Sequence, residues 1–256
     1  VLSQSRYMPD RRDLNRSFPG STSGSLAGRL AQVFMKEIVR RCDYGIDLHT
    51  GAIHRSNMPQ IRADLKDEET LALAKSFGVP VLINSEQRDG SLRQSALEEG
   101  IKTLVYEAGQ ALRFDEISIR AGVSGVLNVL SHLAMIRKRK HKKPILPFVA
   151  NNSSWMRAGH SGIVNTIKEL GDYVQKGDTL AYIGSPFGET LATVVASRTG
   201  VIIGKQNIPL AQEGEAMIHI AIFSEDEGDI VDNIESMQET MTSMPTTEFP
   251  EPGDVL

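Results

Sequence analysis

The stretch DYGIDLHTG, residues 43–51, has the pattern of a short apolar strand that ends in polar residues. The stretches GVPVLIN and IKTLVYEAG repeat this pattern, and predicted helices at residues 67–77 and 91–99 precede them. Strands that alternate with helices predict an α/β domain with a largely parallel sheet. In such sheets the ligand site lies beyond the carboxyl ends of the strands, which is where His49 and Glu107 stand.

Two further segments have the periodicity of amphipathic helices. Residues 24–41 form the first, with Ser25 as a candidate N-cap, and residues 117–136 form a longer one. The expected apolar positions of the first helix are Leu26, Leu30, Val33, Phe34, Ile38 and Val39. A basic run, RKRKHKK at residues 137–143, follows the second helix. Positive side chains at the C-terminal end of a helix interact favourably with the helix dipole, and such runs are usually solvated. We therefore do not predict nucleic-acid binding from this run.

Beyond Pro144 and Pro147 the composition changes to short strands separated by glycine turns. The segment GDYVQKGDTLAYI, followed by a GVI strand, resembles the flattened barrel of biotinyl and lipoyl carrier domains. Carrier domains need a lysine at the exposed hairpin, but the turn here reads SPFGE. The resemblance therefore implies a small all-β barrel without the carrier function.

The composition of the chain suggests its domain boundaries and gives no reason to expect nucleic-acid or membrane binding. We expect a catalytic domain at residues 1–143, the barrel domain at 144–223 and a flexible acidic tail at 224–256, which holds ten acidic residues and no Lys or Arg. The net charge of −4 gives no general reason to bind nucleic acid, and no apolar run reaches the roughly 20 residues that span a membrane. A single cysteine, Cys42, excludes an intramolecular disulfide and fits a reducing, cytoplasmic location.

The loop DRRDLNRSFPGS, residues 10–21, gathers polar donors ahead of a Phe-Pro-Gly turn. A guanidinium matches a carboxylate with two parallel hydrogen bonds, and an adjacent amide supplies a further donor. Asn15 and Arg16 are therefore candidates for a carboxylate clamp. The alternative is a structural loop in which Asp13 pairs with a neighbouring arginine.

His49 and Glu107 are the candidates for chemistry at the sheet edge. A histidine at a strand end is a plausible metal ligand, and Asp47 or a backbone carbonyl could fix its tautomer. Glu107 follows an apolar strand and could act as a general base. The alternatives are a structural histidine and a glutamate in an ion pair.

The ordered set SRY, DLNRSFPG, DLHTG, PQIRAD and VYEAG, with a β-barrel behind it, resembles the succinylglutamate desuccinylase and aspartoacylase family, within the zinc carboxypeptidase superfamily. The resemblance covers the chain from Val1 to about Phe223. It implies a mixed, largely parallel sheet flanked by helices and one zinc ion per chain. The implied roles are a zinc ligand at His49, a catalytic glutamate at Glu107, a carboxylate clamp at Asn15 and Arg16, and an arginine facing the oxyanion at Arg6.

The chain differs from the family pattern in its zinc ligands. The family's first two zinc ligands come from a His and a Glu in a motif upstream of DLNR, and no H-x-x-E pattern occurs in this sequence. A catalytic zinc usually has three protein ligands, of which this chain supplies one. We expect the intact gene product to contain the missing pair.

The implied activity is that of a zinc-dependent amidohydrolase, or deacylase, acting on a small N-acyl amino acid through metal-activated water, with Glu107 carrying the proton. Two alternatives stay open, namely a metallocarboxypeptidase acting on short peptides and a non-catalytic binding or scaffold protein with a decayed metal site. The acyl group is equally open, because a second substrate carboxylate would need another cation. Arg55, Arg62, Arg88 and Arg93 are unranked candidates for that cation, and a homo-oligomer is compatible with the sequence.

Overall fold

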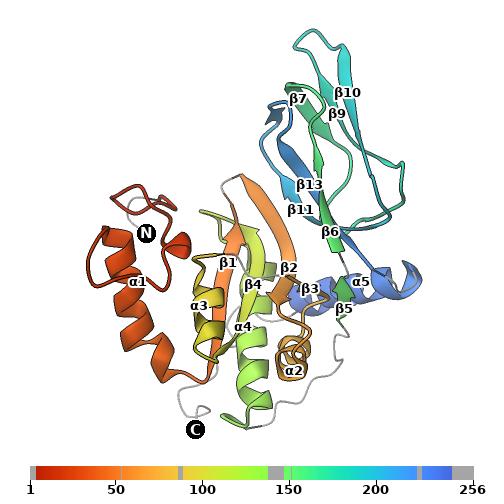
Figure 1. The fold of residues 1–256 in the computed structure, drawn as a ribbon. Coiled ribbons are helices and arrows are strands. Elements are labelled where there is room, and N and C mark those ends of the chain that lie inside the picture. Colours follow the sequence, from red (N-terminus) through yellow and green to blue (C-terminus); the bar gives the residue numbers. More distant parts are fainter. Residues whose placement is uncertain are drawn as a thin grey trace.

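The computed structural model describes residues 4–52, 54–85, 89–137, 147–150, 152–223 and 227–243. A nine-stranded sheet forms its centre, with helices packed against the α/β part and a β region projecting from it (Figure 1). The mixed α/β fold predicted from the sequence is confirmed.

The α/β part has both parallel and antiparallel strand pairs. Its strands are β1 (Tyr44–Gly51), β2 (Arg55–Ala63), β3 (Val81–Asn84), β4 (Lys102–Gln110) and β5 (Phe148–Ala150). The pairs β1 with β4, β2 with β3 and β3 with β5 are parallel, whereas β2 and β4 are antiparallel. Strand β1 thus lies beside β4, although residues 52–101 separate them in sequence.

Each helix of the α/β part begins at a side-chain cap, and the predicted cap at Ser25 is confirmed. They are α1 (Leu26–Glu37), α2 (Glu68–Phe77), α3 (Leu92–Glu98) and α4 (Glu116–His132), with 3-10 turns η1 (Leu14–Arg16) and η2 (Val39–Arg41). The side chains of Ser25, Asp67, Ser91 and Asp115 each accept a hydrogen bond from a backbone N–H in the first turn of α1, α2, α3 and α4. Such caps satisfy donors that have no partner inside the helix.

Helix α1 and the turn after it bury only part of the expected apolar face, since Phe34 and Val39 pack in a buried cluster with Ala31 and Met35. The buried residues of α1 are Ala27, Ala31 and Met35, which recur every four positions. Leu26 and Val33 from the predicted apolar set are instead 47% and 52% exposed. The helix backbone lies close to the loop at Gly20, where a Cβ atom would be 2.2 Å from the carbonyl oxygen of Gly28, so glycine allows this approach.

Strand β2 is a feature that the sequence analysis did not predict. Pro59 lies inside it, and a proline cannot donate to a sheet ladder. The register between β2 and β4 shifts between Asn57 and Gln60, so the proline stands at an irregularity where no ladder bond is required.

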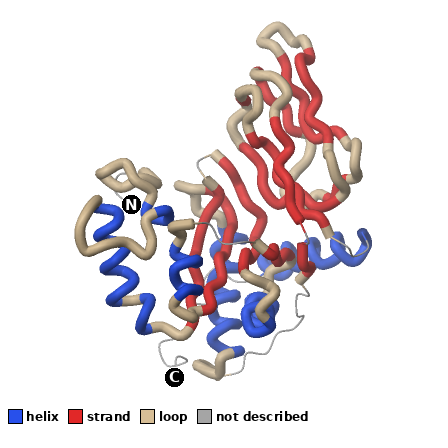
Figure 2. Tube along the Cα trace, viewed as in Figure 1, coloured by secondary structure: helices blue, strands red, loops and turns tan. Residues whose placement is uncertain are grey.

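Residues 152–222 are entirely strands and turns. Strands β6 (Asn152–Arg157), β8 (Tyr173–Val174), β11 (Gly200–Gln206) and β13 (Ala216–Ile222) join the central sheet, whereas β7 (Gly162–Thr166), β9 (Thr179–Gly184), β10 (Thr190–Val195) and β12 (Leu210–Ala211) form a second, four-stranded sheet. Buried side chains between them, including Leu180, Ile183 and Ile218, make a core separate from that of the α/β part. Because β11 pairs with β2, these strands continue the central sheet (Figure 2).

The acidic tail differs from the flexible segment that was expected. Helix α5 (Glu227–Ser243) buries Ile230, Ile234 and Met237 in the core of the α/β part. These residues have the three- and four-residue spacing of one helix face, which supplies the apolar stripe that docks the segment. Residues 244–256 of the predicted tail lie outside the described residues.

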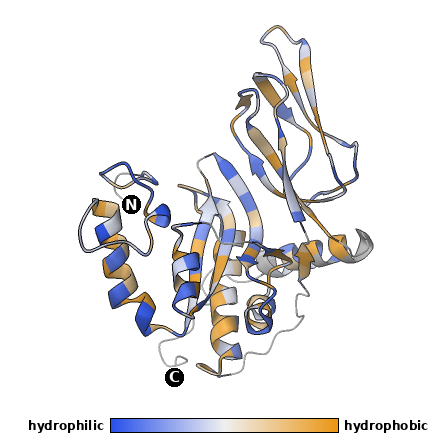
Figure 3. Cartoon of the chain, in the orientation of Figure 1, coloured by the Kyte–Doolittle hydropathy of each residue, from blue (hydrophilic) through white to orange (hydrophobic). Residues whose placement is uncertain are grey.

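Helix α4 is mostly apolar (Figure 3) and packs closely against the core. A Cβ atom at Gly125 would lie 2.0 Å from Cε1 of Phe77, whose ring stacks on Tyr106 with centroids 5.1 Å apart. Glycine therefore allows the helix to approach these rings. No helix in the described part of the chain is both long and apolar enough to cross a membrane.

Replacing Gly125 by alanine tests this contact. Alanine normally favours a helix over glycine by up to about 1 kcal/mol, but here the steric clash should dominate and lower the free energy of unfolding by about 1–3 kcal/mol. Urea unfolding of Gly125→Ala, Phe77→Leu and the double variant measures the effect. The double variant should lose less than the sum of the two single changes, and simple additivity would refute the proposed contact.

Candidate active site

The centre of the site is a pair of side chains on adjacent parallel strands. His49 of β1 is paired in register with Glu107 of β4, and Nδ1 of His49 lies 3.9 Å from Oε1 of Glu107. Because both strands run in the same direction, their carboxyl ends bring these two residues to one edge of the sheet. The side chains are 28% and 18% exposed, so both remain accessible from solvent.

Asp47 orients the imidazole of His49. The two residues are separated by one position on β1 and therefore point to the same face. Nε2 of His49 lies 2.9 Å from Oδ2 of Asp47, and this hydrogen bond raises the pKa of His49 while burial acts in the opposite direction. With Nε2 engaged, Nδ1 is the nitrogen that faces Glu107.

Asn57 is a site residue that sequence reasoning missed. It donates from Nδ2 to Oε2 of Glu107 at 3.0 Å, from the unpredicted strand β2. Glu107 is therefore held from one side by Asn57 and faces His49 on the other. No local signal in the sequence identifies Asn57, because its position depends on the antiparallel pairing of β2 with β4.

The loop that carries Asn15 and Arg16 is fixed against the start of α3. Oδ1 of Asn15 accepts from the backbone N–H of Leu92 at 2.8 Å, and the N–H of Phe18 donates to Gly90 O at 3.0 Å. Gly90 has φ +73°, and a Cβ there would lie 2.7 Å from the carbonyl oxygen of Arg16. Glycine is thus required for this close approach.

Arg6 pairs with Asp13 of this loop. Its Nε and Nη2 donate to Oδ2 of Asp13 at 2.9 and 2.7 Å, which is the structural pairing named as an alternative. Oδ1 of Asp13 also accepts from the N–H of Asn15 at 3.0 Å. Asp13 therefore ties Arg6 to the turn that presents Asn15 and Arg16.

One cavity of about 570 Å³ collects all five predicted site residues, Arg6, Asn15, Arg16, His49 and Glu107. Arg55, Arg62, Arg93 and Arg157 also line it, whereas the carboxylates in its lining are those of Asp47 and Glu107. Six guanidinium groups against two carboxylates make the cavity suited to an anionic ligand. The fourth candidate cation, Arg88, lies outside the described residues, and His54 is exposed and does not line the cavity.

The β region supplies the far wall of the cavity. Trp155 of β6 stacks on His219 of β13, with ring centroids 4.5 Å apart and an angle of 7° between the planes. Arg55 of β2 lies over the tryptophan, with its Cζ atom 5.1 Å from the ring centroid. Burial lowers the pKa of His219 to about 3, and the charge of Arg62 acts in the same direction.

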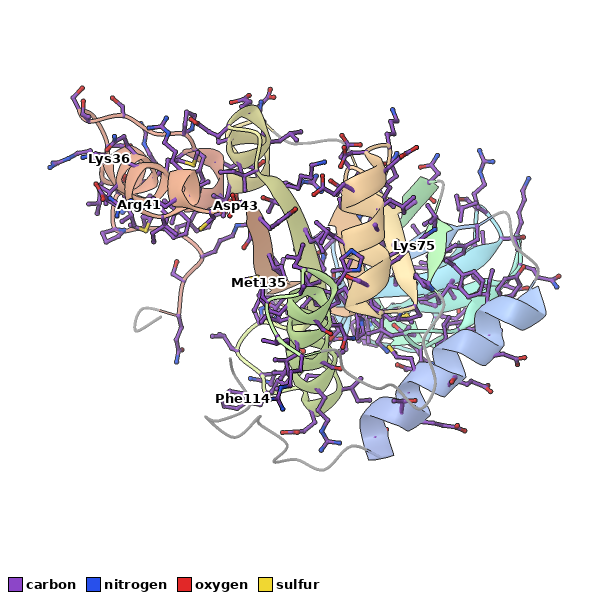
Figure 4. The ribbon with its side chains drawn as sticks, turned by 90° about the horizontal axis from the view of Figure 1, so that it is seen from below. Lys36, Arg41, Asp43, Lys75, Phe114 and Met135 are labelled. Atoms are coloured by element: carbon purple, nitrogen blue, oxygen red, sulfur yellow. The ribbon has the colours of Figure 1, made fainter. Side chains whose placement is uncertain are left out.

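A second hollow of about 530 Å³ lies on the other side of β1, between the sheet and α4. Apolar residues such as Leu48 and Val126 form most of its lining, and His49 and Thr50 belong to both cavities. Phe114, just before α4, is 96% exposed and points away from the fold in Figure 4.

The site fits a metal ion in part. Nδ1 of His49 can serve as one ligand, and the contact of Nε2 with Asp47 is the carboxylate–histidine arrangement typical of metal sites. Across the ranges that the structure describes, no three His, Cys, Asp or Glu side chains gather as a metal-binding group. A zinc site with three protein ligands would need two more besides His49.

Comparisons with known proteins agree with this architecture. A family described as the succinylglutamate desuccinylase/aspartoacylase catalytic domain matches residues 1–133. The N-alpha-acetyl-L-2,4-diaminobutyric acid deacetylase of Halomonas elongata is 26% identical over 224 residues, which cover 83% of this chain and 66% of that protein. The chain thus spans slightly less than two thirds of that curated relative.

Solved structures show the same fold. The product-bound ectoine utilization protein EutE (DoeB) from Ruegeria pomeroyi superimposes with a TM-score of 0.78 at 24% identity, covering 86% of this chain and 71% of that one. A succinylglutamate desuccinylase/aspartoacylase from Rhodobacter sphaeroides gives a TM-score of 0.74 at 23% identity, covering 87% and 71%.

The buried His219 predicts a pH effect on stability. It stays neutral in the folded state down to about pH 3, whereas in the unfolded chain it binds a proton below 6.5. Between these two pH values the free energy of unfolding therefore decreases as the pH falls, by up to about 1.4 kcal/mol per pH unit. Urea unfolding of the wild type and His219→Phe should show this extra slope in the wild type alone. Above about pH 7.5 the two curves should run parallel, and parallel curves at lower pH would contradict the assignment.

Proposed function

Because the chain belongs to the succinylglutamate desuccinylase/aspartoacylase family, we propose that it hydrolyses the amide bond of a small N-acyl amino acid. The products would be a carboxylic acid and a free amino acid. The observation that carries the proposal is the His49–Glu107 pair at the edge of an arginine-lined cavity. The Halomonas elongata relative is by its name a deacetylase, which supports amide hydrolysis as the reaction class.

Asn15 and Arg16 would hold the carboxylate of the amino acid. Arg16 bonds to the carbonyl oxygen of Asn15, and the Oδ1 atom of Asn15 is already used by Leu92, so the Nδ2 amide group is the end that can donate to a ligand. An amide donor beside a guanidinium matches the two oxygens of a carboxylate. The contact with α3 would fix the orientation of the substrate before reaction.

Glu107 would act as general base and then as general acid. Its Oε2 atom is held by Asn57, and the carboxylate can take one proton from the attacking water and return it to the departing amine. The water oxygen forms the new bond to the carbonyl carbon, and the C–N bond breaks. Arg6 would stabilise the negative charge that develops on the carbonyl oxygen, while its bond to Asp13 keeps the guanidinium in place.

Zinc is proposed as the cofactor, with Nδ1 of His49 as one ligand. When bound, the ion would supply Lewis-acid activation of the water and of the scissile carbonyl. The hydrogen bond to Asp47 would hold the imidazole in the tautomer that leaves Nδ1 available.

The β region would act as a small, barrel-like cover that restricts the site to small substrates. Trp155 and Arg157 from β6 line the same cavity as His49, so a long peptide would meet this wall. Assays with N-acetyl and N-succinyl amino acids against short peptides would separate a deacylase from a carboxypeptidase. Zinc analysis of the full-length product would separate both from a scaffold protein.

Replacing Glu107 by glutamine tests the catalytic role. In the full-length gene product, Glu107→Gln should reduce kcat by about 10²–10⁴-fold because the proton acceptor is lost while the shape is kept. Hydrolysis of N-acyl amino acids measures turnover, and metal analysis should show unchanged zinc content. Glu98→Gln on the exposed face of α3 is the matched control and should retain wild-type turnover. Undiminished turnover by Glu107→Gln would rule out this role.

A further inference from the structure

We propose that the β region takes part in the reaction itself, because its strand β11 positions Asn57 and, through Asn57, the carboxylate of Glu107. Gly204 in β11 and Asn207, directly after β11, are the positioning residues. This inference rests on the proposed function, in which Glu107 is the base. It gives the β region a role beyond covering the site.

Residues 55–57 of β2 lie between two other strands. They pair with β11 on one side, where Gly204 is opposite Asn57, and with β4 on the other side, where Gly109 is opposite Asn57. The register with β4 shifts after Asn57, where Pro59 interrupts the strand. Because the ladder along the rest of β2 does not continue regularly to Asn57, the position of Asn57 depends on its pairing with β11.

Gly204 leaves room for the side chain of Asn57. A Cβ atom at Gly204 would lie 3.0 Å from Oδ1 of Asn57 and 3.3 Å from Cβ of His219, both closer than an ordinary nonbonded contact. The other end of the same amide, Nδ2 of Asn57, donates to Oε2 of Glu107 at 3.0 Å. His219 is buried and cannot yield easily, so a side chain at position 204 would displace the amide that holds Glu107.

Asn207 joins the start of β2 to the end of β4. Its backbone N–H donates to the carbonyl oxygen of His54 at 2.7 Å. Its Nδ2 donates to Oγ of Ser56 at 2.5 Å and to Oε1 of Gln110 at 2.8 Å. Ser56 is the neighbour of Asn57, and Gln110 lies on the strand that carries Glu107. The side chain of Asn207 therefore restrains these two strands relative to each other at the site.

This restraint matters for proton transfer. With Oε2 bonded to Asn57, the carboxylate of Glu107 cannot rotate freely, and its Oε1 stays directed towards His49 at 3.9 Å. Oε1 is then the oxygen that takes the proton from water and returns it to the departing amine. Loss of a residue that orients a reacting group typically reduces activity by about 10–100-fold.

Kinetics of the full-length gene product with N-acetyl and N-succinyl amino acids test the positioning role. Asn57→Ala should lower kcat by about 10–100-fold. Gly204→Ala and Asn207→Ala should each lower kcat by about tenfold, with little change in KM, because Asn15 and Arg16 lie on a different loop. In the Asn57→Ala background neither change should lower kcat further, because both act through Asn57.

Gly159→Ala is the matched control and should keep the wild-type kcat. It is the same substitution in the turn between β6 and β7, where a Cβ atom would meet only Cβ of Ala192, at an ordinary 3.8 Å. A general disturbance of the β region would not depend on Asn57. Equal losses of kcat in the wild type and in the Asn57→Ala background, or an undiminished kcat in Gly204→Ala, would therefore overturn the proposal.

Urea unfolding tests the contact without turnover and so separates it from the proposed function. Gly204→Ala should lower the urea midpoint of the wild type, and it should lower that of Asn57→Ala much less, since the atom that the new Cβ meets is gone. Additive shifts of the midpoint would refute the contact. If no N-acyl amino acid is hydrolysed but the shifts are non-additive, the proposed reaction fails and the coupling of β11 to Asn57 stands.

Discussion

The register between β1 and β4 is the constraint on which the site depends. A shift of one residue would turn His49 to the opposite face from Glu107, because side chains alternate along a strand. The same register sets the position of Asp47, which must share a face with His49 to orient the imidazole. Asn57 then completes the cluster from the antiparallel side of β4. The site is therefore built on three adjacent strands, whose ladder hydrogen bonds limit the movement of its members.

The sequence identifies the parts of the site that carry local signals. His49 and Glu107 follow apolar strands, and Asn15 and Arg16 stand in a dense polar loop, so their residue types and positions are visible without a structure. The cap at Ser25 follows from capping chemistry in the same way, and the predicted helices at residues 67–77 and 91–99 begin at the residues that cap them. These features depend on a few neighbouring residues, which is why reasoning along the chain finds them.

Features that depend on long-range pairing escape such reasoning. Asn57 and Arg55 lie on β2, whose Pro59 argues against a strand until the irregular register with β4 is known. Trp155 reaches the cavity, and His219 stacks behind it, only because β11 joins β2 and extends the sheet. The exposed Leu26 and Val33 of α1 show a related limit, since periodicity predicts an apolar face without showing whether a partner covers it.

The path of the chain around the β region has a mechanical consequence. Strand β5 enters the region from the edge of the α/β sheet by pairing with β3, and α5 returns from it to pack Ile230, Ile234 and Met237 into the first core. The region is thus tethered at both ends and also along the β2–β11 ladder. Swinging it outward like a hinged lid would require breaking that ladder, so ligand exchange is expected to proceed by side-chain rearrangement at a fixed opening.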